Sequence, residues 1–508
     1  MADLRFTFTD SDRAKNVIIA ATLTAIGAFY ILTIRQGHDW GDDFSAYIHH
    51  AKNIIEGVKY DRIGYIPNPY YPIYGGEYPP VFPLLLSPVY YWFGLNLTAM
   101  KIEIILLFLA FLLSFYLFLK RELPFHYAWS VIAIIGFNPY FWDLKDQILS
   151  ELPFIFIAYA SLYFIYRVYE EKKSHRPLYA LLAGAFIYLA YGTRAIGIVM
   201  LASLWVYDFI KTKRISRFAL LTTSVSVPLM ILQSLLMLGG KIYYDLLAFK
   251  PQVIYANLGL TLRDLYLIWE NGFSDAFAIA LFIVLLALAA IGYWSRVTYR
   301  VTIYEVFAAL YLVSVIIYPL VMVRRYVIPV IPLFIFYVFV GIARAVPFRQ
   351  KIFEQVTSSA LIIAVLFSYA GKYSKEDFGP IRSGVGMETT KELFSFIKDS
   401  TEISDVFIFW KPRSLALFTG RRASVYNPET KDEELWSFIQ TIDAGYIVIG
   451  RDDPERIRQF RSKHRNGLKL VFGNQDYQVY QIDAQYREKL MSAANNPHGL
   501  KRHLIGPR

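Results

Sequence analysis

The chain has 508 residues, of which 56% are hydrophobic and 18% are charged. This balance excludes an ordinary soluble protein, and the mean hydropathy of +0.36 indicates membrane-spanning helices. The absence of cysteine excludes disulfides, thiolate metal sites and cysteine catalysis. The net charge of +11 would suit nucleic-acid binding, so the placement of the basic residues has to decide that question.

The first apolar segment, residues 16–34, is about as long as a spanning helix. The residues after it, Arg35 to His38, do not resemble a signal-peptide cleavage site, so we expect an uncleaved first helix. Further apolar segments lie at residues 99–119, 124–142, 148–166, 177–191, 195–210, 218–238, 274–293, 302–319, 327–343 and 355–371. The sequence therefore predicts a polytopic α-helical membrane protein with about eleven spans.

Residues 80–94 are a special case, because this apolar stretch is short and is broken by Pro83 and Pro88. We expect a re-entrant or interfacial helix here rather than a span.

The connections between spans indicate the orientation, since lysine and arginine accumulate on the cytoplasmic side. If the N-terminus is cytoplasmic, every connection on that side is basic: Lys120 and Arg121; Arg167, Lys172, Lys173 and Arg176; Lys211, Lys213, Arg214 and Arg217; Arg296 and Arg300; Arg344, Arg349 and Lys351. These residues explain most of the positive charge as a topology signal, so we expect no nucleic-acid partner. The outer face then receives the segments around Asp42, 138–151, 191–194, 239–273 and 318–326.

Two carboxylates, Asp42 and Asp43, follow the first span directly. Tyr47, His50 or Ala51, and Ile54 follow at three- and four-residue steps, which predicts a helix that begins at Asp43 and ends at Gly57. An acid suits the start of a helix because of the helix dipole, so a simple capping role is one reading. Charge next to a membrane span is costly, and a functional role is the other.

A wider pattern favours the functional reading. It comprises Asp43, Tyr47, Ile48, Ala51, the run Ile54 to Gly57 and the turn Tyr78, Pro79, Pro80. It resembles the first outer loop of the GT-C glycosyltransferases, membrane enzymes that use polyprenyl-phosphate sugars and include protein O-mannosyltransferases and aminoarabinose transferases. The resemblance implies that the aspartate is the catalytic base. Many members have a second acid after it, whereas this chain has Phe44 after Asp43 and Asp42 before it, so the base is Asp43 or Asp42.

The resemblance also suggests partners for this base. Glu151 lies at the start of a span, where the family often has an acid; it would orient the acceptor or hold a cation, or it simply complements the helix dipole. Asp143 and Asp146 nearby are interpreted as solvated loop charges.

Arginines at an outer membrane edge are unusual, because lysine and arginine normally accumulate on the cytoplasmic side. A guanidinium group can bind a phosphate through two parallel hydrogen bonds. Arg325, with Arg324 before it and Tyr326, Pro329 and Pro332 after it, resembles the family's motif near the lipid phosphate. Arg194, in the sequence YGTRA, fits another family position. Snorkelling to lipid headgroups is the alternative for these arginines.

Residues 65–80 are rich in aromatic side chains, proline and glycine, so they either line a sugar pocket or form an interfacial turn. We expect Tyr47, Tyr78 and Glu77 to line the acceptor or sugar site. His38, His49 and His50 have no third ligand at a helpful spacing, which favours structural histidines and predicts no metal site. No cofactor is obligatory for a monophosphate leaving group, although an acid pair could hold a divalent cation.

Short β-like runs at residues 406–410, 446–449, 468–472 and 477–482 alternate with helical stretches at 389–398, 432–442 and 454–463. We therefore expect a catalytic membrane domain at residues 1–371, an extracytoplasmic α/β domain at 372–492 and a mobile tail at 493–508. The membrane domain would include a first outer loop with juxtamembrane helices at 35–98 and a long outer loop at 239–273.

Together with these patterns, the resemblance to the GT-C family implies an inverting glycosyltransferase that moves a sugar from a polyprenyl-phosphate donor to a hydroxyl of a glycan, glycolipid or protein. We expect it in the lipid bilayer of the plasma membrane, with a cytoplasmic N-terminus and an extracytoplasmic active site. The alternative is a transporter or flippase of lipid-linked sugars, which would more often show paired repeats and polar groups within its spans.

Overall fold

The computed structural model describes residues 10–71, 78–171, 176–237, 251–270, 274–318, 324–345, 351–427, 431–483 and 485–486. The chain divides into two compact units. Unit 1 comprises Met1–Ile34, Pro79–Phe82 and Thr98–Phe378, and unit 2 comprises Arg35–Tyr78, Pro83–Leu97 and Gly379–Arg508.

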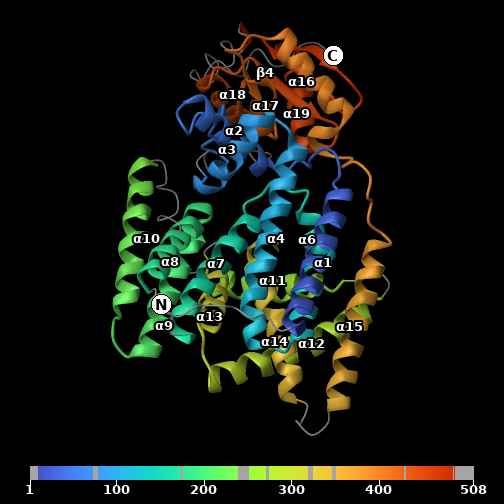
Figure 1. Ribbon diagram of the computed structural model, residues 1–508. Helices are drawn as coiled ribbons and strands as arrows, with labels where there is room; N and C mark the ends of the chain where they lie inside the picture. Colours follow the sequence, from blue (N-terminus) through green and yellow to red (C-terminus); the bar gives the residue numbers. More distant parts are fainter. Residues whose placement is uncertain are drawn as a thin grey trace. The chain divides into compact units, whose positions relative to one another are not determined.

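Within its described residues, unit 1 is built from α-helices and two short 3₁₀ segments (Figure 1). In chain order these are α1 (Asp10–Leu32), α4 (Leu97–Glu122), α5 (Phe125–Gly136), α6 (Pro139–Leu144), α7 (Glu151–Glu170), α8 (Arg176–Thr193), η1 (Ala195–Gly197), α9 (Ile198–Thr212), α10 (Arg217–Leu236), α11 (Pro251–Leu267), α12 (Asp275–Tyr299), α13 (Ile303–Ile316), η3 (Arg324–Val330), α14 (Ile331–Ala345) and α15 (Lys351–Tyr373). A helix lies at each of the predicted spans.

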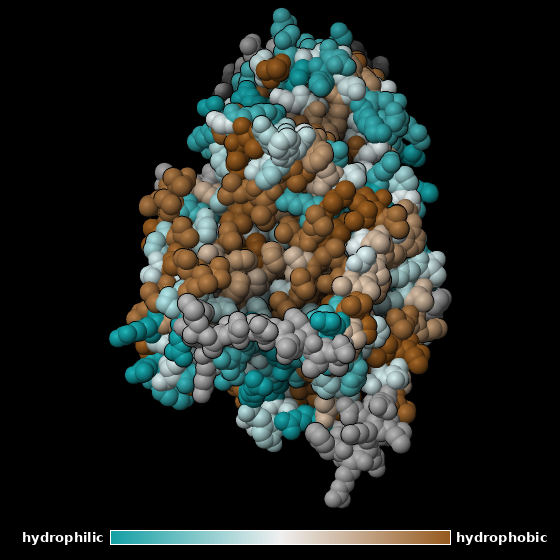
Figure 2. Space-filling view, viewed as in Figure 1, coloured by the Kyte–Doolittle hydropathy of each residue, from teal (hydrophilic) through white to brown (hydrophobic). Residues whose placement is uncertain are grey.

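Seven helices among the described residues are both long and apolar enough to cross a bilayer. They are Asp12–Leu32, Leu97–Glu122, Glu151–Glu170, Ala195–Thr212, Arg217–Leu236, Asp275–Tyr299 and Arg325–Ala345. Shorter apolar helices include Val81–Phe93 and Ile303–Ile316. Figure 2 shows apolar side chains gathered over the helices of unit 1, as lipid contact requires. The chain is therefore an integral membrane protein, and the count of eleven spans stays a prediction.

The predicted long outer loop at residues 239–273 contains helix α11, which the sequence analysis did not predict, and its outer location stays a prediction. The buried positions of α11 are Asn257, Thr261, Asp264 and Leu265. Asn257 Nδ2 donates to the carbonyl of Tyr318 at 2.9 Å. Apolar periodicity does not reveal this helix, because most of its buried face is polar.

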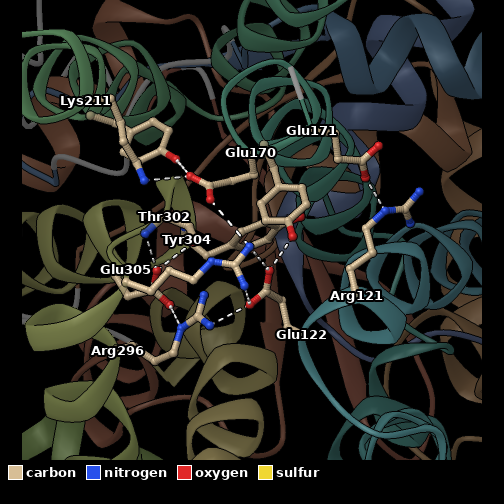
Figure 3. Close-up of polar contacts among 12 residues, drawn as sticks. Arg121, Glu122, Glu170, Glu171, Lys211, Arg296, Thr302, Tyr304 and Glu305 are labelled. Atoms are coloured by element: carbon tan, nitrogen blue, oxygen red, sulfur yellow. Dashed lines mark hydrogen bonds and ion pairs between the residues drawn. The ribbon is translucent and has the colours of Figure 1, made fainter. Parts of the chain in front are cut away.

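An ion-pair network joins the ends of five helices of unit 1 (Figure 3). Glu122 at the end of α4 accepts from Arg296 Nη1 of α12 at 2.6 Å, and Arg296 Nε donates to Glu305 of α13 at 3.1 Å. Glu170 of α7 pairs with Lys211 of α9 at 2.7 Å. Basic residues predicted as topology signals therefore also hold the helix ends together. The C-terminal ends of α4, α7, α9 and α12 meet the N-terminal end of α13, which fixes the helix directions.

Unit 2 contains a sheet of six strands in the order β1-β3-β2-β4-β6-β5. The strands are β1 (Tyr65–Ile66), β2 (Val406–Ile408), β3 (Arg422–Ser424), β4 (Tyr446–Gly450), β5 (Leu468–Gly473) and β6 (Tyr477–Ile482). The pairs β1/β3, β2/β3 and β2/β4 are parallel, and β4/β6 and β5/β6 are antiparallel. The helices of unit 2 are α2 (Asp42–Glu56), most of α3 (Val81–Phe93), α16 (Glu388–Ser400), α17 (Pro412–Thr419), α18 (Asp432–Thr441) and α19 (Glu455–Lys463).

The sequence predicted four of these strands and five of these helices but missed β1, β3 and α17. Strand β1 comes from the predicted first outer loop, and Tyr65 is in register with Ala423 and Ile66 with Ser424 of β3. This pairing explains why residues 35–78 cluster with the C-terminal residues, although the sequence assigned them to the membrane domain.

Helix α2 packs on helix α17 within unit 2. Ser45 Oγ lies 2.8 Å from Ser414 Oγ. Gly64 has a φ of +71°, and a Cβ at this position would lie 2.8 Å from Cβ of Ala416, so the chain before β1 passes close to α17. Ala46, Ile63, Tyr65 and Val425 form a small apolar core beside this contact.

Helices α12 and α14 of unit 1 approach through glycine. A Cβ at Gly292 would overlap the carbonyl oxygen of Tyr337, and a Cβ at Gly341 would overlap that of Leu288. Both obstacles are backbone atoms, which a change of side-chain rotamer cannot relieve. Close helix packing in a bilayer typically depends on such small residues.

Gly292→Ala should therefore destabilise the protein by about 2 kcal/mol or more, because the two helices have to move apart. The matched control is Gly259→Ala in α11, where a Cβ would meet nothing within 4 Å. It should be neutral or stabilise by about 0.5–1 kcal/mol through helix propensity. Thermal unfolding of detergent-solubilised protein, followed by size exclusion, measures both. Equal midpoints for the two variants would contradict the close packing.

Candidate functional site

Asp42 and Asp43 are the first two residues of α2, and Gly57 ends this helix in the left-handed conformation with a φ of 66°. Unpaired backbone N–H groups at a helix start favour negative charge, so the local fold suits two adjacent carboxylates.

Asp43 contacts two side chains of unit 2. The hydroxyl of Tyr78 donates to Asp43 Oδ1 at 2.5 Å. Arg413 Nη1 donates to the Tyr78 oxygen at 3.0 Å and lies 3.6 Å from Asp43 Oδ1. Tyr78 thus bridges the guanidinium and the carboxylate.

Asp42 pairs with the same arginine through other atoms, since Arg413 Nε lies 3.7 Å from Asp42 Oδ2. The Asp42 side chain is 13% exposed, whereas that of Asp43 is 26% exposed. Burial raises the pKa of Asp42, and the charges of Arg413 and Lys411 lower it without cancelling the effect. The two carboxylates therefore have different environments, and Asp43 is the more accessible.

Arg413 is the residue at this site that sequence reasoning missed. It lies in the first turn of α17 after strand β2, and its side chain is only 3% exposed. Burial works against its charge, but Tyr78, Asp42 and Asp43 together hold the pKa of Arg413 above its usual value. No local motif marks it, because long-range contacts, the pairing of β1 with β3 and the packing of α2 on α17, bring this part of the chain to α2.

The backbone of Tyr78 is fastened by α2 and the segment after it. The hydroxyl of Tyr60 donates to the Tyr78 carbonyl at 2.8 Å. His50 Nδ1 donates to the Tyr60 carbonyl at 2.8 Å, which leaves Nε2 as the acceptor for the Tyr78 amide at 3.5 Å. The ring of Tyr47 lies 4.6 Å from that of Tyr78. Two of the predicted sugar-lining residues are thus neighbours, and Glu77 lies outside the described residues.

The other two histidines of this region are engaged in packing or are uncharged. His38 is buried and stacks on Phe44 with ring centroids 3.8 Å apart. Burial lowers the pKa of His49 to about 4, so its ring is neutral at pH 7. Among the residues that the structure describes, no group of three or more histidine or acidic side chains is placed to hold a metal ion.

Unit 1 brings the other predicted residues together at the N-terminal end of α7. Arg194 Nη1 donates to Glu151 Oε1 at 2.5 Å and to Ser150 Oγ at 3.1 Å. Arg325 Nη1 lies 3.4 Å from the same Glu151 oxygen. The guanidinium of Arg194 also faces the ring of Tyr326 at 5.3 Å. Two arginines therefore share one carboxylate oxygen.

Burial and exposure differ strongly within this cluster. Glu151 is 2% exposed, and its other oxygen, Oε2, is buried without a hydrogen-bond partner among the described residues. The Arg325 side chain is 34% exposed, so this end of the cluster is accessible. Arg324 begins η3, and its side chain lies outside the described residues.

The interpretation of Asp146 as a solvated loop charge is wrong. Asp146 is fully buried, as are Lys101 and Lys145, whose Nζ atoms lie 3.4 Å and 2.5 Å from its carboxylate. Lys145 also lies over the ring of Trp142 at 4.0 Å. Lys145 and Asp146 directly follow α6 and Lys101 comes from α4, so the composition of residues 138–151 alone does not reveal this burial.

No family model matches the sequence, and no curated protein is similar to it in sequence. The fold, by contrast, is similar to those of solved membrane enzymes. ArnT from Cupriavidus metallidurans, bound to undecaprenyl phosphate, superposes with a TM-score of 0.61 at 12% identity, over 92% of this chain and 98% of that chain.

Two structures of the Archaeoglobus fulgidus oligosaccharyltransferase are similar as well. AglB in complex with an inhibitory peptide and a dolichol-phosphate gives a TM-score of 0.60 at 12% identity, over 86% of this chain and 69% of that chain. The complex with Zn and sulfate gives 0.61 at 12% identity, over 94% and 76%. The chain therefore has the GT-C fold of these membrane glycosyltransferases.

Proposed function

We propose that the protein is a glycosyltransferase that moves a sugar from a polyprenyl-phosphate donor to an acceptor hydroxyl. The observation that carries the proposal is the sharing of buried Glu151 by Arg194 and Arg325. The three side chains sum to one positive charge, which suits the single negative charge of a phosphodiester. Similar folds that hold undecaprenyl phosphate or dolichol-phosphate support this assignment.

The leaving phosphate gains charge during transfer, and this gain is what the arginines would stabilise. As the bond from the anomeric carbon to the phosphate oxygen breaks, the phosphate changes from one negative charge to nearly two. A guanidinium group can donate two parallel hydrogen bonds to two phosphate oxygens. Such bonds stabilise the developing charge most strongly in a site that excludes water. Glu151 would orient both arginines through the oxygen that they share, and Arg324 would add to the positive charge.

Asp43 is proposed as the base that takes the proton of the acceptor hydroxyl. The acceptor oxygen then attacks the anomeric carbon from the side opposite the phosphate, so the configuration inverts. The new carbon–oxygen bond replaces the bond to the phosphate, and polyprenyl phosphate leaves. Tyr47, Tyr78 and Glu77 are proposed to line the acceptor site, and the acceptor is a glycan, a glycolipid or a protein.

The carboxylate proposal predicts a specific difference between neighbouring variants. Asp43→Asn removes the proton acceptor and should lower transfer about 10²–10⁴-fold, whereas Asp42→Asn should keep more activity. The assay incubates purified protein with labelled polyprenyl-phosphate sugars and a membrane extract and measures the label that reaches an acceptor. Near-normal turnover in both variants would contradict the assignment of either aspartate as the catalytic base. Label that crosses a vesicle bilayer while it stays on the donor would identify a transporter.

Arg325→Ala should mainly weaken the use of the donor, because a lost charge-assisted hydrogen bond costs about 1.5–3 kcal/mol. The KM for the donor should rise about ten-fold or more, and the KM for the acceptor should not change. The matched control is Arg263→Ala, since Arg263 belongs to the same unit but is 56% exposed and pairs with its neighbour Asp264. Equal donor KM values in the two variants would contradict a phosphate site at Arg325.

The orientation predicted from the basic connections places the Glu151 end of α7 outside the cell and the network end inside. The chain has no cysteine, so single-cysteine variants report the orientation directly. Ala276→Cys at the start of α12 should react with an impermeant maleimide in intact cells, because α12 ends in the network. Arg214→Cys, beyond the end of α9, should react only after permeabilisation. The reverse pattern would overturn the orientation.

A further inference from the structure

We infer that Arg413, from the C-terminal part of the chain, is the positioning residue of the proposed base. It orients Asp43 through the Tyr78 hydroxyl and holds Asp42 beside it. This inference rests on the proposed function and adds a residue that lies outside the family pattern recognised in the sequence.

The geometry uses the fork of a guanidinium. Nε of Arg413 faces Asp42 at 3.7 Å, while Nη1 donates to Tyr78 at 3.0 Å and lies 3.6 Å from Asp43. One side chain thus addresses two consecutive carboxylates from different atoms. A lysine has a single nitrogen and cannot reproduce this pattern.

Charge gives the second argument. Two adjacent carboxylates at the start of one helix repel each other, and partial burial strengthens that repulsion. Arg413 is nearly fully buried, so its charge acts on both carboxylates with little screening by solvent. Removing it would leave two carboxylates without this cation, which favours protonation of one of them.

Unit 2 holds Arg413 in place from several sides. The rings of Tyr65 and Tyr78 face its guanidinium at 5.2 Å and 5.4 Å. The next residue, Ser414, contacts Ser45 of α2 at 2.8 Å. These contacts fix the distance between the start of α17 and the start of α2, so the orientation of the carboxylates is set before a substrate binds.

A pH dependence follows from the groups around Asp42. Arg413 and Lys411 lower its pKa, while burial and the charge of Asp43 raise it. Tyr65 and Tyr78 lie beside the guanidinium of Arg413. Burial raises the pKa of each tyrosine, so both are protonated and neutral near pH 7. Loss of Arg413 therefore moves the pKa of the carboxylate pair upward. The acidic limb of the rate profile should shift to higher pH.

The test compares Arg413→Gln with Arg421→Gln. Arg421 is also buried in unit 2, but it follows the other end of α17 and donates to backbone carbonyls of Thr419, Lys398 and Thr401. Both variants should lose stability. Only Arg413→Gln should lower kcat about ten-fold or more, with an unchanged donor KM and an acidic limb at higher pH. Compared with Arg413→Gln, Arg413→Lys should return the acidic limb of the pH–rate profile to its original pH but should recover only part of kcat.

If Arg413→Gln does not fold, Tyr78→Phe takes its place, because it removes only the hydroxyl that joins Arg413 to Asp43. It should lower kcat several-fold and leave the donor KM unchanged. The inference is overturned if kcat and the pH profile of the folded variant equal those of Arg421→Gln, or if the donor KM changes instead of kcat. An inactive Asp43→Asn with a normal Arg413→Gln would reject this inference alone. An active Asp43→Asn would reject the proposed function itself.

Discussion

A buried guanidinium that faces two adjacent carboxylates is the interaction on which the arrangement of unit 2 depends. Arg413 is 3% exposed, so its charge has to be matched inside the protein, and Asp42 and Asp43 match it. This requirement couples the start of α2 to the start of α17, which are far apart in the sequence. Strand β1 has only two residues, yet its pairing with β3 secures the same connection. Residues 35–78 therefore fold with the C-terminal part of the chain, and the proposed base is oriented by residues from both.

Buried charges also have to be matched in unit 1, and the two ends of α7 differ in how they are matched. The helix has 20 residues, so its ends are about 30 Å apart. At the C-terminal end, Glu170 accepts from Lys211 and from the hydroxyl of Tyr207. At the N-terminal end, Glu151 has a buried oxygen without a hydrogen-bond partner among the described residues, and Arg325 beside it is a third exposed. The charges at the first end are paired within the protein, whereas the second end keeps a partly exposed guanidinium beside a buried carboxylate.

The sequence predicted the features that depend on local pattern. Apolar length located the helices, and the spacing from Asp43 to Gly57 predicted α2 and its end. It did not predict α11, whose buried face is largely polar, or the burial of Asp146 against two lysines. It also missed Arg413, because that contact is created by short strands that periodicity cannot detect. Local sequence patterns thus predicted most helices and the carboxylates of the candidate site. Arg413 could not be predicted in this way, because it reaches the carboxylates through contacts between distant parts of the chain.

The sequence left the choice between Asp42 and Asp43 open by one residue, and the structure supplies physical grounds for a division of roles. Consecutive residues of a helix point about 100° apart, so the two carboxylates meet Arg413 through different nitrogen atoms of its guanidinium. Asp42 faces Arg413 Nε from a more buried position, and burial raises its pKa. Asp43 is twice as exposed and receives the Tyr78 hydroxyl on one oxygen. A base has to reach the acceptor, whereas a counter-charge has only to reach the arginine, so Asp43 suits the first role and Asp42 the second.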